Sequence, residues 1–154
     1  MKAYKNIIVP TDGSVNSKRA LEHAIVLASS LGASITLVYV ANIVSVISNF
    51  DQIPKFDQIP NASGYVTEQV ALDMEEEGKG VLDDFAKEVP EGIDVKTVFE
   101  VGSPGPAVLS VAKKYKADLI VMGSRGLGPL KGLFMGSVSS YVVTHSGCPV
   151  LIVK

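Results

Sequence analysis

Short apolar runs and segments of helical spacing alternate along almost the whole chain, and few folds accommodate this order. The apolar runs predict strands at residues 7–9, 35–40, 93–101, 118–122 and 150–153. Apolar residues return every three or four positions in most of the intervals between them, as on one face of a helix. Strict strand–helix alternation favours a parallel sheet with helices on both faces and right-handed crossovers. We therefore predict one α/β domain over residues 1–154.

Local signals mark where several of these helices begin and end. Gly32 is placed to end the first helix, because glycine readily adopts the left-handed conformation of a helix stop. Ser103 can cap a later helix, with Pro104 at its first position. The strand at 93–101 alternates apolar and polar residues, which indicates a half-exposed position at the edge of the sheet.

The segment 42–66 departs from both patterns. It contains a tandem copy of five residues, at 50–54 and again at 56–60, and a proline closes each copy. Two prolines without periodicity do not suit a long helix. We predict an inserted mobile loop on the surface, with a ligand lid or a partner contact as the alternative.

The next helix carries an acidic run, Glu75, Glu76 and Glu77, among apolar residues at helical spacing. Such a run could suggest a metal site, but on the far face of an amphipathic helix it is more often a solvated surface. We therefore assign the run no chemistry.

Composition excludes several classes of protein. With 47% hydrophobic and 19% charged residues, the chain is not expected to be disordered. The chain has 14 Lys and Arg against 16 Asp and Glu, and its basic residues form no continuous stripe along the sequence. This argues against a nucleic-acid partner. We expect no membrane span and no signal peptide, since the apolar stretches are too short for either. Cys148 is the only cysteine and cannot form an internal disulfide, so we expect a cytoplasmic protein.

The alternating pattern also predicts where a ligand binds. We expect an open five-stranded, Rossmann-like sheet of order 3-2-1-4-5, which has a topological switch point between strands one and four. Ligands of such sheets bind beyond the carboxyl ends of the strands at that point. Two loops rich in turn-forming residues, 10–13 and 123–126, meet there. The sequence thus places a binding site between these two loops.

The second loop suits a phosphate. Gly123 and Gly126 permit positive φ and a close approach of the backbone to a ligand. Gly136 and Ser137 open a helix whose first amides favour an anion, and the serine adds a hydroxyl. Arg125 offers a cationic fork, and Lys131 further along the loop adds charge. Together these residues predict a phosphate-bearing ligand.

Each of these residues also has a purely structural explanation. Gly136 and Ser137 form a turn and helix cap in many proteins, Arg125 suits a solvated surface, and Asp12 is a common turn residue. Two other glycine motifs are absent. Lys131 stands where the dinucleotide pattern G-x-G-x-x-G needs its last glycine, which disfavours a nicotinamide enzyme. No P-loop pattern occurs, which disfavours an ordinary P-loop ATPase.

The spacing G-x-x-G, nine residues, then G-[ST] is met by Gly123, Gly126, Gly136 and Ser137. It resembles the nucleotide loop of the ATP-binding branch of the universal stress protein family. The likeness extends to residues 7–14, 101–104, 118–123 and 148–153. The resemblance implies that the ligand is ATP, with or without Mg²⁺. It also implies that the protein acts in a stress response.

The resemblance also implies the residues that contact the nucleotide. Asp12 and the backbone of Val40 would lie beside the adenine, next to Pro10 and Thr11 of the same opening motif. The residues implied beside ribose and phosphates are Met122, Gly123, Arg125, Gly126, Gly136, Ser137 and Val138.

The last strand predicts how the chain assembles. Val150–Val153 would form an apolar edge strand with Lys154 as its only charged neighbour. Such an edge is prone to pair with another sheet, and members of the family that the chain resembles are usually homodimers. We predict a homodimer through this strand.

No residue is suited by its spacing to catalysis. ATP hydrolysis needs a group that orients or deprotonates water. His23 and His145 lie on expected helices without a suitably spaced partner, and Cys148 suits a small core residue. We predict an ATP-binding regulatory or protective module. The alternatives are a nucleotide-independent dimeric interaction protein of the same fold, and a slow ATP hydrolase or a transferase.

Overall fold

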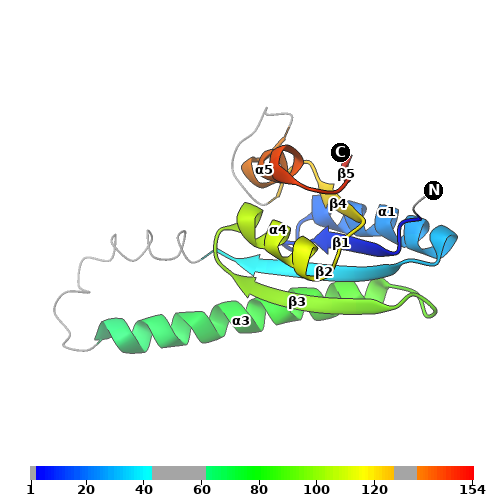
Figure 1. Cartoon of the computed structure of the whole chain (residues 1–154). Coiled ribbons are helices and arrows are strands. Elements are labelled where there is room, and N and C mark those ends of the chain that lie inside the picture. The colour runs from blue at the N-terminus through cyan, green and yellow to red at the C-terminus, as the bar shows by residue number, and fades with distance from the viewer. Residues whose placement is uncertain (1–2, 43–61, 127–134) are drawn as a thin grey trace.

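The computed structural model describes residues 3–42, 62–126 and 135–154, and its centre is a five-stranded sheet of order β3-β2-β1-β4-β5 (Figure 1). The elements in chain order are β1 (Asn6–Pro10), α1 (Val15–Leu31), β2 (Ser34–Ala41), α3 (Ala62–Glu88), β3 (Val95–Val101), α4 (Pro104–Lys114), β4 (Leu119–Gly123), α5 (Ser137–His145) and β5 (Val150–Val153). Every neighbouring pair of strands is parallel. The predicted fold class and strand order are confirmed.

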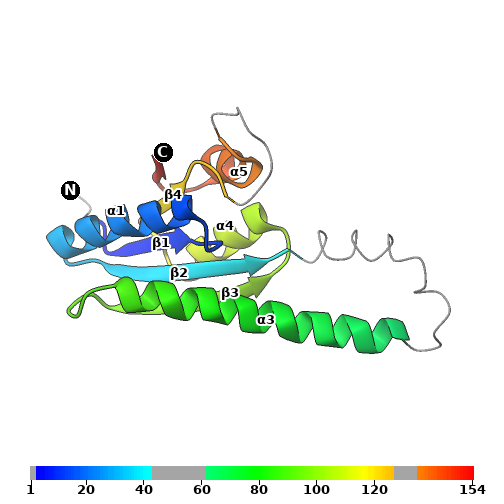
Figure 2. The same cartoon turned by 180° about the vertical axis from the view of Figure 1, so that it is seen from behind.

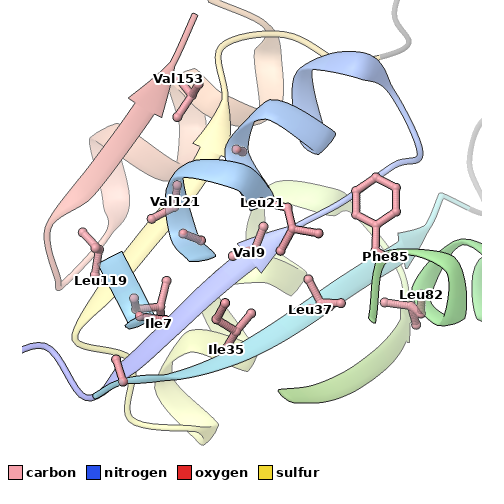
Figure 3. Packing of buried hydrophobic residues seen from close by; sticks show 14 residues of the cluster. Ile7, Val9, Leu21, Ile35, Leu37, Leu82, Phe85, Leu119, Val121 and Val153 are labelled. Carbon is pink, nitrogen blue, oxygen red and sulfur yellow. The ribbon is translucent and has the colours of Figure 1, made fainter. Parts of the chain in front are cut away.

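The sheet has one core on each face, because successive side chains of a strand point to opposite sides. Ile7 and Val9 of β1 belong to the core beneath α1 and α3, whereas Ile8 belongs to the core beneath α4 and α5. Figure 3 shows the first core, where Leu21 of α1 and Phe85 of α3 lie over the sheet. All three β1 residues are fully buried, and each such burial stabilises the fold by about 1.5–3 kcal/mol. Burial on both faces explains why the central strands are apolar without interruption.

Two of the three predicted helix boundary signals act as expected. Gly32 follows the last turn of α1 with φ 64°, the left-handed conformation of a helix stop. Pro104 is the first residue of α4 and Ser103 is its N-cap, but the Ser103 side chain makes no capping hydrogen bond. At α1 the cap is Ser14 instead, whose Oγ accepts from the Ser17 N–H at 3.2 Å.

Helix α3 corrects the predicted loop. It begins at Ala62, so residues 62–66 are helical and the end of the predicted loop 42–66 was wrong. Ala62, Ser63 and Gly64 at this start of α3 show no apolar periodicity. The tandem copy at 50–54 and 56–60 lies outside the described residues. The amino-terminal turns of α3 extend past the carboxyl ends of β2 and β3 (Figures 1 and 2). No helix in the described part of the chain has the length and apolar character of a membrane span.

Candidate functional site

The loops that follow β1 and β4 lie at the same edge of the sheet, since these two central strands pair in parallel. Pro10 is the last residue of β1 and is half-buried. The next residue, Thr11, is buried, and its N–H donates to the Val38 carbonyl oxygen at 2.8 Å. This hydrogen bond ties the exit of β1 to β2. Val40, two residues further along β2, is half-buried.

Asp12 forms the turn between β1 and α1. Its Oδ1 accepts from the Ser14 N–H at 2.9 Å, a common aspartate turn that prepares the start of the helix. The other carboxylate oxygen of Asp12 lies against Gly126, where a Cβ would overlap it. The structure therefore brings Asp12 and Gly126 together, although they are far apart in the sequence.

Close packing, not unusual backbone conformation, explains the glycines of the second loop. A Cβ on Gly123 would lie 3.0 Å from Cβ and 3.1 Å from the backbone carbonyl carbon of Asn16 in α1. Positive φ occurs at Gly13 and three other described glycines, but not at Gly123, Gly126 or Gly136. The expectation of positive φ at the first two was wrong. They are glycines because α1 and Asp12 occupy the space that a side chain would need.

The start of α5 is fixed to the end of β4. The Gly136 N–H donates to the Ser124 carbonyl oxygen at 2.7 Å, and the Ser139 Oγ donates to the same oxygen at 2.8 Å. Gly136 is the N-cap of α5, and no side chain among the described residues caps this helix. The first amides of α5 therefore keep the partial positive charge that favours an anion. Ser137, at the first helical position, is exposed.

The remaining predicted residues lie around these three segments. Met122 is buried in the core beneath α4 and α5, so its side chain serves packing. Arg125 is exposed beside Gly126, and Val138 is half-buried in the first turn of α5. Lys131 lies outside the described residues.

The other reactive side chains have ordinary surroundings. His145 stacks on Tyr141 with ring centroids 4.1 Å apart, and its Nδ1 lies 2.9 Å from the Tyr141 carbonyl oxygen. His23 is exposed on α1, and Cys148 is half-buried with its N–H donating to Ser146 Oγ. Within the ranges that the structure describes, no three His, Cys, Asp or Glu side chains gather as metal ligands.

Comparison with known proteins places this geometry in a family. The model described as "Universal stress protein family" matches residues 3–154. The chain belongs to the universal stress protein family. Universal stress protein MJ0531 of Methanocaldococcus jannaschii is 36% identical over 152 residues, which are 98% of this chain and 82% of that protein.

Solved structures agree with the fold of this universal stress protein. UspA from Lactobacillus plantarum superposes with a TM-score of 0.73 at 25% identity, over the full length of both chains. A universal stress protein solved in complex with cAMP gives a TM-score of 0.60 at 25% identity and covers 99% of this chain and 98% of that one. At least one solved protein with this fold therefore binds a nucleotide, cAMP.

Two residues of the site were not singled out from the sequence of this universal stress protein. Asn16 adjoins Gly123, yet nothing in its neighbourhood along the chain signals that contact. Ser139 is only 2% exposed and holds the Ser124 carbonyl. Its signal was available, since a serine stands on a helix face that otherwise points into the core. Both contacts join segments distant in sequence, which local patterns do not reveal.

Proposed function

We propose that this universal stress protein binds an adenine nucleotide, ATP foremost, and acts as a regulatory or protective module rather than an enzyme. The observation that carries the proposal is the start of α5, where Gly136 leaves the first amides without a side-chain cap beside the Ser124 turn. Helix starts of this kind bind phosphates. The relative solved with cAMP supports an adenine nucleotide as the ligand class.

The residues around this helix start divide into two groups by chemistry. The amides of Ser137 and Val138, with the Arg125 guanidinium, suit the phosphates. Asp12 and the backbone of Val40 offer acceptors and donors for the adenosine end. Between them, Gly123 and Gly126 of the β4 exit would let the chain approach the ribose. A Mg²⁺ ion bound with ATP would be held mainly by the phosphates and water.

The first test is chemical analysis of the purified protein. Acid extraction followed by chromatography should release an adenine nucleotide, or calorimetry of stripped protein should show binding of Mg-ATP. Absence of both results would contradict the proposal. Steady ATP turnover that Asp12→Ala abolishes would instead support the enzyme alternative.

A matched pair of arginines tests the phosphate end. Arg125→Ala removes a charged hydrogen-bond donor and should weaken ATP binding by about tenfold, the low end for a charged hydrogen bond at an exposed position. Arg19→Ala, on exposed α1 surface, removes the same charge and should leave binding unchanged. Equal losses in the two variants would show that only net charge matters.

We further propose a homodimer through β5, in the cytoplasm. β5 is an end strand of the sheet, and its Leu151 is 37% exposed. An apolar edge strand is commonly protected by pairing with another strand, and a two-fold axis allows two copies of β5 to protect each other. Sedimentation should show a dimer at micromolar concentration, and Leu151→Lys should weaken it. A monomeric wild type would contradict this part of the proposal.

A further inference from the structure

Helix α3 contacts the sheet beside the proposed nucleotide site. At Gly78 it passes over Tyr39 of β2 and Phe99 of β3, whose rings stack with centroids 6.0 Å apart and an interplanar angle of 8°. One turn later, at Val81, it lies over Gly13, where an added Cβ would be 3.4 Å from a Val81 methyl group. These two contacts fix α3 beside the loop that holds Asp12.

The helical repeat then places Glu77 on the same side of α3 as the contact with Gly13. Glu77 precedes Val81 by four residues, so the two side chains lie on the same face of α3, one turn of about 5.4 Å apart. Because α3 runs opposite to the strands (Figure 2), Glu77 lies one turn nearer than Val81 to the end of α3 that extends past the carboxyl ends of β2 and β3. Glu77 therefore lies on the side of α3 that meets Gly13, one turn beyond the Val81 contact.

Electrostatics at Tyr39 agree with this placement. Burial raises the pKa of the Tyr39 phenol, and the negative charges of Glu77 and then Asp12 raise it further. Both carboxylates thus lie close enough to one hydroxyl to act on its ionisation. They come from two different elements, α3 and the β1–α1 loop, which meet beside the proposed adenosine end.

Two carboxylates at one end of a site select for hydrogen-bond donors. An ionised carboxylate only accepts hydrogen bonds, and it repels another acceptor that faces it. Adenine presents an amino group at its 6-position, whereas hypoxanthine, the base of ITP, presents a carbonyl oxygen there. The phosphates belong at the opposite end, beside Arg125 and the start of α5, where the negative charge of Glu77 does not oppose them.

We propose that Glu77 is a specificity-determining residue that selects a 6-aminopurine over a 6-oxopurine by accepting a hydrogen bond from the 6-amino group. This inference rests on the proposed function, since it assigns the base end of the same site. It also separates Glu77 from Glu75 and Glu76 of the same acidic run. Glu75 is paired with Lys79 at 2.6 Å, and Glu76 lies about 100° around the helix from Glu77.

The test compares the Kd values of ATP and ITP for three forms of the full chain by calorimetry. Wild type should bind ATP at least tenfold more tightly than ITP, because a hydrogen bond to a charged group carries a preference of about this size. Glu77→Gln, whose amide can both accept and donate, should bring the ratio close to one. Glu76→Gln, which makes the same charge change on the neighbouring residue, should keep the wild-type ratio. Far-UV circular dichroism checks that both variants remain folded.

The outcomes separate this inference from the proposed function. If wild type binds ATP and Glu77→Gln keeps its ratio, the role of Glu77 is wrong and nucleotide binding stands. Equal loss of selectivity in Glu76→Gln would also overturn the role, since general charge would then explain it. If wild type binds neither ATP nor ITP, the proposed function and the inference both fail.

Discussion

Replacing Gly78 by alanine tests how closely α3 lies on the sheet. The added Cβ would stand 2.5 and 2.7 Å from two ring atoms of Phe99 and 2.7 Å from Tyr39, whereas ordinary contact begins at 3.4 Å. Because the two rings are stacked, neither moves aside without disturbing the other. Overpacking of this kind costs about 2–3 kcal/mol, and the better helix propensity of alanine returns about 1 kcal/mol. Gly78→Ala should therefore lower the free energy of unfolding by about 1–2 kcal/mol.

Gly80 in the same helix provides the control. A Cβ there meets nothing within 4 Å, so Gly80→Ala should gain the full propensity of about 1 kcal/mol. Urea denaturation followed by circular dichroism measures both variants. Their difference of about 2–3 kcal/mol corresponds to roughly 1 M urea in the midpoint at a typical slope of about 2–3 kcal/mol/M. If both alanines stabilise the protein equally, the register of α3 on β2 and β3 is wrong, and so is the position assigned to Glu77.

Three further predictions concern other parts of the molecule. Lys116 has φ 52°, so Lys116→Gly should raise the unfolding free energy by about 1 kcal/mol, seen as a higher Tm; an unchanged or lower Tm would contradict this. Gly105→Ala would place a Cβ 2.5 Å from the Tyr141 ring and should cost about 1–3 kcal/mol in urea denaturation; no loss would show that α4 and α5 are further apart. The pKa of Tyr39 is raised above its ordinary value in the folded state, so its contribution to stability is complete below about pH 10 and falls as the pH rises towards the folded pKa. Denaturation at several alkaline pH values should show a smaller loss for Tyr39→Phe, and an identical loss would contradict the shift.

The fold could be predicted well from the sequence, because the pattern of apolar and polar residues in each strand indicates how deeply that strand is buried. The unbroken apolar runs of β1 and β4 indicate strands covered on both faces, and the alternation in β3 indicates an edge. The first helical turns of α3 were missed, since Ala62, Ser63 and Gly64 give no apolar periodicity in a part of the helix that extends beyond the sheet (Figure 1).

The contacts within the candidate site could be predicted only in part, because motifs report local chemistry and not contacts between distant segments. Turn residues and glycines marked the two loops and the start of α5. The reason for Gly126 depends on Asp12, which lies more than a hundred residues away, and therefore needed the structure. The same holds for the role proposed for Glu77, which no sequence pattern distinguishes from its acidic neighbours.

ATP is proposed to bind where the β4 exit passes Asp12, and calorimetry of Mg-ATP with two glycine variants measures whether it does. Gly126→Val adds a side chain where a Cβ already overlaps the Asp12 carboxylate, and Gly147→Val adds the same side chain in open space. With both variants folded by circular dichroism, Gly126→Val should lose at least tenfold in affinity, because its side chain would displace the Asp12 carboxylate from the proposed site. Gly147→Val should match wild type. Unchanged affinity in a folded Gly126→Val protein would contradict the claim.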